Sequence, residues 1–250
     1  MAANSDKVAS AEACSRSEAI AVTLRDEILR GQYRPGERLP SERDLATRFN
    51  TGRGPVREAL KRLEQLGIAS IQLGGARAVA IEECTLDVLG PLLDLDDLPD
   101  PRLLDQVLQV LGVLVHLAAR TALRNASDEQ MAEIKRRAQS LTERRTDQVG
   151  YHHALRQFTD YLVDVADHLV LRLIMNGLRT SAFSRMRELQ IQISFDDESY
   201  RQIATELSAA VDDRDHEKVG DAMHRFNRYF RDSVKTAMDA RRNARKSANA

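Results

Sequence analysis

Cationic side chains in the first third of the chain have the types and the spacing needed to bind a polyanion. Arg53, Arg57 and Lys61 follow one another at intervals of four residues, so a helix would carry them along one side. Arg43 and Arg77 lie before and after them. A guanidinium group can hold a phosphate or a guanine edge through two parallel hydrogen bonds, and a lysine adds a charge that attracts phosphate. The pattern indicates contacts with double-stranded DNA.

The segment that carries Arg43 is predicted to form a short helix over residues 41–49. Ser41 can cap its first turn, where the helix dipole favours the acidic side chains of Glu42 and Asp44. The apolar positions fall on one side of this helix and predict a buried face of Leu45, Ala46 and Phe49.

A turn and a second helix follow. Residues 50–52, Asn-Thr-Gly, tolerate turn conformations, and Pro55 suits the first turn of a helix predicted over residues 54–67. Its apolar positions recur at helical spacing: Val56, Ala59, Leu60, Leu63 and Leu66. In a helix-turn-helix the second helix enters the major groove with its N-terminal residues nearest the bases. Arg53 and Arg57 are therefore the leading candidates for base or phosphate contacts.

After Gly67 the periodicity changes from helical to alternating, which indicates a two-stranded hairpin over residues 68–81. Gly74 and Gly75 are expected at its tip. Glycine lets the backbone approach another molecule closely, and Arg77 beside the tip can reach a phosphate or the minor groove. We expect this hairpin to be a wing that contacts DNA.

These segments resemble the winged helix-turn-helix domain of GntR-type bacterial transcription regulators. The matching phrases are LPSERDLA, RGPVREAL and LEQLGI, followed by a glycine-tipped wing. The resemblance implies operator contacts by Arg43, Arg53 and Arg57, and a wing contact around Gly75. Together with the positions argued above, the predicted DNA-binding set is Arg43, Arg53, Gly54, Arg57, Lys61, Gly75 and Arg77.

Length, composition and charge limit the class of protein. The 250 residues suffice for two domains, and hydrophobic residues make up 42% of them, enough for real cores. Residues 16–78 hold 12 Lys and Arg against 8 Asp and Glu, whereas the whole chain has a net charge of −1. A basic head on an acidic body suits DNA binding, because phosphate neutralisation supplies much of the affinity.

The sequence favours a cytoplasmic protein without a membrane span. No apolar run approaches the roughly 20 residues that cross a bilayer, and residues 1–15 lack the apolar core of a secretion signal. Cys14 and Cys84 are the only cysteines of the sequence, so we expect no disulfide framework and a reducing cytosol as the natural setting.

The predicted fold is mainly α, with a winged helix-turn-helix domain followed by an antiparallel all-helical bundle. The expected parts are a disordered arm over residues 1–15, the winged domain over 16–81, a linker over 82–101, the helical domain over 102–240 and a basic tail over 241–250. The first helix of the winged domain is expected over residues 16–31, ending at Gly31. The linker is acidic, holds three prolines and is expected to contain a short helix at 86–93.

From residue 103 onward the chain shows helical periodicity, and six or seven helices are expected. The segments 103–123 and 151–175 have wide apolar faces that must be buried, and breaks are expected near residues 125, 147–150, 195–197 and 212–215. This part resembles the effector-binding and dimerisation domain, of FCD type, in the FadR branch of GntR regulators. The resemblance rests on LAAR at 117–120, the run at 158–174 and DRDHEKVGDAMHRF at 213–226.

Many domains of that branch bind a metal ion through one Asp and three His, and the resemblance locates the equivalent positions. The metal-binding phrase DxxFH aligns with LRQFT, which places Leu155 and Thr159 at the first two positions. The other two positions fall near Ala204 and Phe226. Apolar side chains cannot coordinate a divalent cation, so we expect no metal ion and no cofactor.

The histidines leave other interpretations open. Asp164 and His168 are four residues apart and could present two donors on one helix face, so a metal site there stays an alternative. His152 and His153 are expected to be surface or helix-start residues. His116, inside an apolar run, is a candidate for lining an effector cavity.

Without a metal ion, an effector would be held by a cavity of the bundle, where apolar walls and a few polar groups give affinity and orientation. Arg120 and Arg179 can each bind a carboxylate or phosphate through two hydrogen bonds. The candidate effector-binding residues are His116, Arg120, Tyr161, Asn176, Arg179 and Tyr200.

These interpretations combine into a homodimeric transcription regulator whose two heads bind a palindromic operator. The favoured output is repression, with operator affinity changed by a small acidic metabolite or an acyl thioester. A ligand-independent dimeric regulator and an activator remain alternatives. An enzyme is not expected, because no cluster of nucleophile, base and oxyanion donor can be identified.

Overall fold

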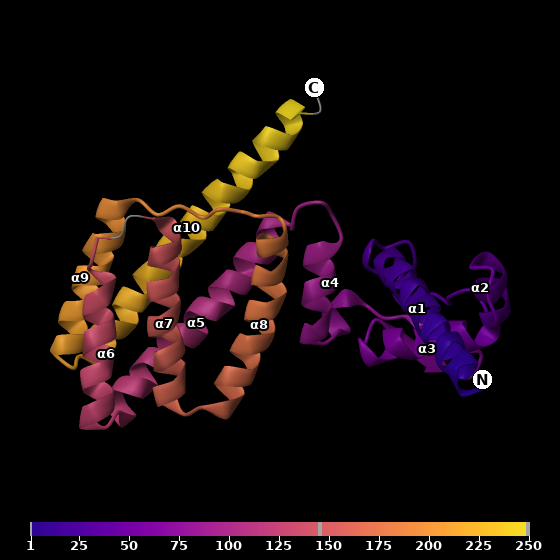
Figure 1. Cartoon of the computed structure of the whole chain (residues 1–250), viewed down its shortest axis with the longest axis horizontal. Coiled ribbons are helices and arrows are strands. Elements are labelled where there is room, and N and C mark those ends of the chain that lie inside the picture. The colour runs from indigo at the N-terminus through magenta and orange to yellow at the C-terminus, as the bar shows by residue number, and fades with distance from the viewer. Residues whose placement is uncertain (1, 145–146, 249–250) are drawn as a thin grey trace. The chain divides into compact units, whose positions relative to one another are not determined.

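The computed structural model describes the backbone of residues 2–144 and 147–248, and side chains over residues 16–144, 147–184 and 186–247. The chain divides into two compact units, Met1–Asp97 and Leu98–Ala250. Helices dominate both units, and the sheet formed by the described residues has two strands (Figure 1). The predicted mainly α fold is confirmed.

The first unit is a winged helix-turn-helix. Its elements are α1 (Ala2–Leu29), α2 (Glu42–Arg48), α3 (Arg53–Gln65), β1 (Ala69–Gln72) and β2 (Gly75–Ala78). Ser41 caps α2 as predicted, because its hydroxyl oxygen accepts a hydrogen bond from the Asp44 amide at 3.2 Å. Asn50, at φ +46°, makes the turn between α2 and α3.

The wing is held along one side by the segment that precedes α2. Strands β1 and β2 are antiparallel, with Ala69 opposite Ala78. The Leu39 amide donates to the Ala76 carbonyl at 2.9 Å, and the Ala78 amide donates to the Glu37 carbonyl at 2.9 Å. Residues 36–39 therefore run along the second edge of β2 and fix the wing to the helices.

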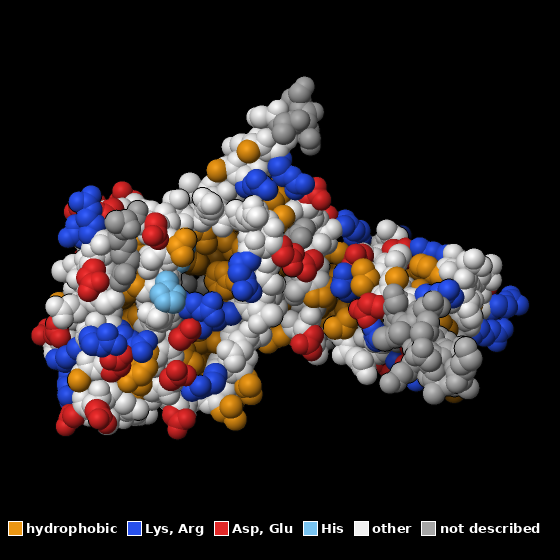
Figure 2. Space-filling model, in the orientation of Figure 1, with side chains coloured by type: hydrophobic (Ala, Val, Ile, Leu, Met, Phe, Trp, Pro, Cys, Tyr) orange, Lys and Arg blue, Asp and Glu red, His pale blue; other side chains and the backbone are white. Residues whose placement is uncertain are grey.

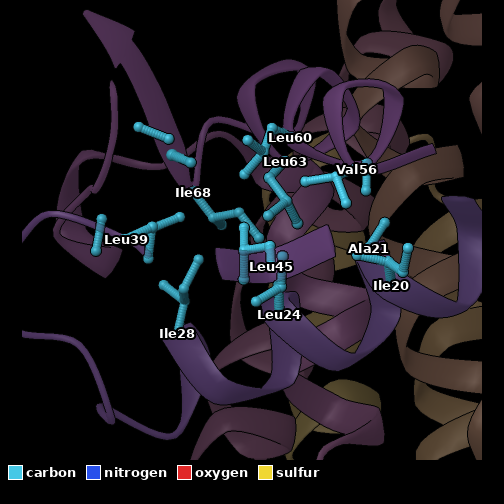
Figure 3. Packing of buried hydrophobic residues seen from close by; sticks show 14 of the residues in the cluster. Ile20, Ala21, Leu24, Ile28, Leu39, Leu45, Val56, Leu60, Leu63 and Ile68 are labelled. Atoms are coloured by element: carbon cyan, nitrogen blue, oxygen red, sulfur yellow. The ribbon is translucent and has the colours of Figure 1, made fainter. Parts of the chain in front are cut away.

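One apolar core joins the three helices and the wing of the first unit. Figure 3 shows labelled side chains from α1, α2 and α3 pointing toward one another, among them Leu24, Leu45 and Leu63, which have no exposed surface. Each large apolar side chain buried in this way contributes about 1.5–3 kcal/mol. The predicted buried side of α3 is confirmed for Val56, Ala59, Leu60 and Leu63, while Leu66 is only partly buried. The opposite side of α3 therefore faces away from the core.

Two segments of the first unit differ from the expectation. The backbone of residues 2–15 belongs to α1, whereas the sequence analysis predicts a disordered arm there. This stretch holds five alanines and neither glycine nor proline, a composition that favours helix.

The second difference is the predicted linker. Residues 82–97 fold onto the winged unit through two short turns and α4 (Leu89–Asp94), which matches the short helix expected at 86–93. Val88 is buried in the winged core, and Leu92 and Leu95 pack against it. The acidic composition suggested a solvated linker, but these apolar side chains bury surface that compensates for ordering the segment.

The second unit is a helical bundle, as predicted, with six helices among its described residues: α5 (Pro101–Asn125), α6 (Asp128–Leu141), α7 (Gln148–Ala166), α8 (Leu169–Glu188), α9 (Asp197–Asp212) and α10 (His216–Ala248). The breaks expected near residues 125, 195–197 and 212–215 are confirmed. The segment 151–175, expected to be continuous, is divided at Asp167, which has φ +47°. The backbone of residues 241–248 continues α10, where a basic tail is predicted.

Helix α5 lies among the other helices of the bundle. It packs against α7, α8 and α10. By length and composition alone it could cross a membrane, a property that the sequence analysis did not find. A central helix of a folded bundle can have the same length and apolar composition.

Helices α5 and α10 approach each other closely at two glycines. A Cβ atom at Gly112 would lie 2.2 Å from Cγ of Asn227, and one at Gly220 would lie 2.6 Å from Cε1 of His116. Asn227 donates a hydrogen bond to the Leu108 carbonyl at 3.0 Å, and Nδ1 of His116 lies 3.0 Å from the Gly220 carbonyl oxygen. Each glycine therefore makes room for a polar side chain that bonds to the other helix.

Replacing Gly112 by alanine should destabilise the second unit by about 1–3 kcal/mol, because Asn227 cannot move aside without losing its hydrogen bond. Thermal unfolding followed by circular dichroism measures the effect. The matched control is Gly177→Ala on α8, where nothing lies within 4 Å of the added carbon; it should be neutral or stabilise by up to about 1 kcal/mol. Equal melting temperatures for the two variants would contradict the close approach.

Candidate nucleic-acid interface and ligand cavity

The predicted DNA-binding residues of α2 and α3 are exposed. Arg53 and Arg57 lie on α3, and the Arg43 side chain on α2 is 78% exposed. Lys61, one turn beyond Arg57, forms an ion pair within its own helix. Gly54 is exposed at the start of α3, with open space where a side chain would be. The cations of α3 thus follow one side of the helix, as their spacing predicts.

Arg57 is held by Glu42 of α2. Its Nε and Nη2 donate to the two carboxylate oxygens at 3.1 and 2.9 Å. This hydrogen bonding lowers the pKa of Glu42, with a smaller electrostatic contribution from Arg53, and it raises the pKa of Arg57. The pair orients the guanidinium beside the start of α3. A phosphate or guanine that binds Arg57 must therefore share it with Glu42 or displace Glu42.

At the wing, two arginines cross between β2 and the preceding segment. Gly75 has φ +122°, and a Cβ atom there would lie 3.0 Å from Nε of Arg38. Arg77 turns back and donates to the Gly36 carbonyl at 2.8 Å. Arg38 could not be identified from local sequence patterns, because its pairing with Arg77 across the sheet edge brings it to the wing.

A cavity of about 450 Å³ lies among α5, α7, α8 and α10. Its apolar lining consists of Leu108, Leu111, Val115, Leu155, Phe183, Ile193, Met223, Phe226 and Phe230, and its polar lining of His152, Arg156, Thr159, Arg179, Thr180, Arg187 and Asn227. Figure 2 shows hydrophobic side chains recessed in this unit, with Lys or Arg side chains and a His at the margin of the hollow. Apolar walls with a few polar groups are typical of small-molecule sites.

The charge of the cavity lining is positive. Three arginines and no carboxylate are among the lining residues. Asp160, beside the cavity, forms ion pairs with both Arg179 and Arg156. Arg187 donates to the Phe183 carbonyl of its own helix at 3.3 Å, and it has no carboxylate partner among the described residues. The lining therefore favours an anion.

Comparison with known families identifies both units. Residues 16–79 match the family described as bacterial regulatory proteins, gntR family, and residues 106–228 match the FCD domain. The chain therefore combines a gntR-family unit with an FCD domain. The two matched ranges fall on the winged unit and on the helical bundle, in the predicted order.

Relatives of this protein include named regulators. It is 31% identical over 158 residues to HTH-type transcriptional regulator Mce2R of Mycobacterium tuberculosis, covering 62% of this chain and 65% of that protein. It is 26% identical over 209 residues to the fatty acid metabolism regulator protein of Yersinia enterocolitica, covering 81% and 84%. A solved GntR-family regulator from Pseudomonas syringae is 20% identical, with a TM-score of 0.46 and coverage of 94% of this chain and 89% of that one. The match to the first relative thus spans just under two thirds of its length.

Of the six predicted effector-binding residues, Arg179 lines the cavity and the others do not. His116 bonds to Gly220 on α10, and Arg120 of α5 forms an ion pair with Glu217 of α10. Both side chains join two helices of the FCD domain. Their apolar surroundings in the sequence do not distinguish a helix contact from a cavity wall.

The remaining three predicted residues also lie elsewhere. The Arg137 guanidinium is 4.5 Å from the centre of the Tyr161 ring, and Asn176 is exposed on α8. Tyr200 is fully buried, with its ring centre 4.7 Å from that of Tyr151. Tyr200 is therefore a core residue of the α7–α9 contact.

Sequence reasoning missed five polar residues of the cavity: His152, Arg156, Thr180, Arg187 and Asn227. His152, predicted to be a surface or helix-start residue, lies near the start of α7 and is half-buried, with its Nε2 2.9 Å from the Ile193 carbonyl oxygen and its ring centre 4.5 Å from that of Phe195. The spacing of the lining residues on α7, at 152, 155, 156 and 159, was available as a signal, because those positions share one helix face.

The residues at the family's metal positions do not fit a metal ion. Leu155, Thr159 and Phe226 line the cavity, and Ala204 is fully buried. The Thr159 hydroxyl donates to the Arg156 carbonyl at 3.0 Å. Among the described residues, no three His, Cys, Asp or Glu side chains gather closely enough to hold a metal.

The alternative site at Asp164 and His168 rests on a helix that the structure interrupts. Asp167 ends α7 in a left-handed conformation, so the two residues do not share one helix face. Asp164 pairs with Arg172 at 2.8 Å, and Nδ1 of His168 accepts from the Leu171 amide at 3.2 Å. Both side chains are engaged in the turn between α7 and α8.

The Glu42–Arg57 pair predicts a carboxylate titration that depends on Arg57. In the wild type, Glu42 should titrate below its ordinary pKa of 4.5, and in Arg57→Gln its midpoint should rise towards 4.5. Nuclear magnetic resonance of the side-chain carbonyl carbon measures both. The control, Arg43→Gln, removes a neighbouring charge outside the pair and should leave the Glu42 midpoint unchanged. The same midpoint in the wild type and in Arg57→Gln would contradict the pairing.

Proposed function

We propose that this gntR-family protein is a cytoplasmic DNA-binding transcriptional regulator. The observation that carries the proposal is the division of α3 into a completely buried apolar side, with Val56 and Ala59, and an exposed side with Arg53 and Arg57. A second helix fixed in this way offers its cations to the major groove. The printed names of relatives such as Mce2R support the same activity.

Each predicted residue has a distinct role in this proposal. Arg53 and Arg57, at the start of α3, contact base edges or nearby phosphates, while Arg43 and Lys61 bind phosphate oxygens. Gly54 has no side chain, so the start of α3 can approach the DNA closely. Phosphate contacts set the register of α3, and base contacts supply the sequence preference.

The wing provides a second contact with the duplex. Gly75 exposes backbone at its tip, and Arg77 lies on β2 beside it. Arg38 lies against Gly75 and adds a second cation to this surface. A cationic wing of this kind binds phosphate or enters the minor groove.

The proposed functional form is a homodimer on a palindromic operator, joined through the second units. Seven large hydrophobic side chains in the described part of the second unit are exposed, and six lie on α5 and α8, which pack against each other: Val110, Val113, Leu117, Leu169, Val170 and Leu173. Six such side chains on two adjacent helices are more than an isolated monomer ordinarily leaves in water. A second copy of the chain covers them, and its symmetry matches that of a palindrome.

The proposed regulation is repression relieved by an anion in the cavity. The arginine-bearing apolar lining supports an acidic metabolite or an acyl thioester as the effector. Names such as HTH-type transcriptional repressor NanR, a 32% identical relative, support repression as the output. A ligand must favour one of two states by about 5.5 kcal/mol to move their ratio from 1:99 to 99:1, so it must bind the cavity much better in the state that releases DNA.

Replacing Arg57 by alanine should weaken binding to an operator selected from the host genome by about 1–3 kcal/mol if it contacts a base. Fluorescence anisotropy at several salt concentrations measures the change, and a smaller salt slope would identify a phosphate contact. Arg136→Ala removes the same charge from an exposed position on α6 and is the control. Full operator affinity without Arg57 would exclude it as a contact, and no sequence preference in the wild type would refute the proposed activity.

The dimer surface predicts that Val113→Glu produces monomers, because two like charges would meet, or be buried, in the interface. Analytical ultracentrifugation measures the mass. The control is Val149→Glu on α7: Val149 is 76% exposed and Val113 is 66% exposed, but Val149 lies on neither α5 nor α8. If Val113→Glu stays dimeric, the interface lies elsewhere on the chain.

A further inference from the structure

We infer that the cavity of the second unit binds a single carboxylate carried on an unbranched apolar chain, directly and without a metal ion. The inference deepens the proposed function and rests on it only for the effect on DNA. A metal ion at the family's metal positions requires Asp and His donors, and the residues present here are different. Leu155 and Phe226 occupy two of those positions, and both face the cavity.

The floor of the cavity suits a hydrocarbon chain. α5 supplies Leu108 and Leu111, and α10 supplies Met223, Phe226 and Phe230. Removing each methylene group from water should strengthen binding about fourfold. A second carboxylate or a hydroxyl group placed against these five side chains would have no partner among them, which weakens binding. This floor therefore disfavours the chelating diacids and hydroxy acids that a metal centre would hold.

The margin of the cavity suits one anionic head group. Arg156 and Arg179 both bond to Asp160, whereas the partner of Arg187 among the described residues is a backbone carbonyl. Arg187 lies on α8 one turn beyond Phe183, which also lines the cavity. A carboxylate beside Arg187 can accept two parallel hydrogen bonds while its chain continues along the apolar side chains.

The same geometry favours a free acid over an acyl thioester. A thioester carbonyl is uncharged, so it forfeits the charge-assisted hydrogen bond that Arg187 offers to a carboxylate. The cavity, of about 450 Å³, falls within the range of sites for small ligands.

Isothermal titration of the full-length protein with hexanoate, octanoate and decanoate tests the ligand class. The Kd should fall about fourfold for each added methylene until the chain fills the cavity. Decanol should bind at least tenfold more weakly than decanoate, and prior treatment with a chelator should change nothing. Stronger binding of a decanoyl thioester, binding of citrate alone, or loss of decanoate binding after chelation would each overturn the inference.

Arg187→Gln tests the head group. It should weaken decanoate about tenfold or more and leave decanol unchanged, since only the carboxylate uses the guanidinium. The matched control is Arg172→Gln, on the same helix, whose guanidinium pairs with Asp164 and does not line the cavity. A thermal melt of each variant shows whether the bundle is folded. Equal losses for decanoate and decanol in a folded Arg187→Gln protein would refute the assignment of Arg187.

A parallel operator-binding assay separates this inference from the proposed function. If decanoate binds in the cavity and operator affinity does not change, the ligand assignment stands and ligand-relieved repression fails. If another class of ligand releases the operator and the three acids do not bind, the ligand assignment fails and the regulatory proposal stands.

Discussion

The second unit depends on the close approach of α5 and α10. Gly112 of α5 and Gly220 of α10 leave space that the side chains of Asn227 and His116 fill. Each of these side chains forms a hydrogen bond to the opposite helix. This contact places the apolar residues of both helices side by side as the floor of the cavity. A wider separation would open this apolar floor to water. The volume and the polarity of the cavity thus follow from two residues that have no side chain.

The first unit balances burial against exposed charge on one short helix. Because one side of α3 is buried in the core, the helix is held in one orientation about its axis. Arg53 and Arg57 therefore point outward. Glu42 then serves two purposes: it lies in the first turn of α2, where the dipole favours it, and it holds Arg57 in place. The pair reduces the entropy that Arg57 loses on binding, and it makes every anion compete with a carboxylate.

The elements of the winged unit could be predicted from patterns between residues close in the sequence. The residues that could not be predicted reach their sites through contacts between distant parts of the chain. The cap at Ser41 and the apolar spacing of α3 act within a few residues, so they could be identified from the sequence. Arg38 reaches the wing only through a strand pairing across 39 positions, and Arg187 reaches the cavity only through the packing of α8. In the bundle, α5 is apolar on more than one side, which hid the side that faces the cavity and misplaced His116. The break at Asp167 contains neither glycine nor proline, so the end of the helix there could not be predicted from the sequence.

The folding of residues 82–97 onto the winged unit shortens the connection between the two units. Only residues 98–100 separate the end of the first unit from the start of α5. Three residues span at most about 10 Å, and one of them is a proline, which stiffens the chain further. In a dimer joined through its second units, so short a tether confines each head to a narrow range of positions. Such a protein would tolerate little variation in the number of base pairs between the two halves of its target.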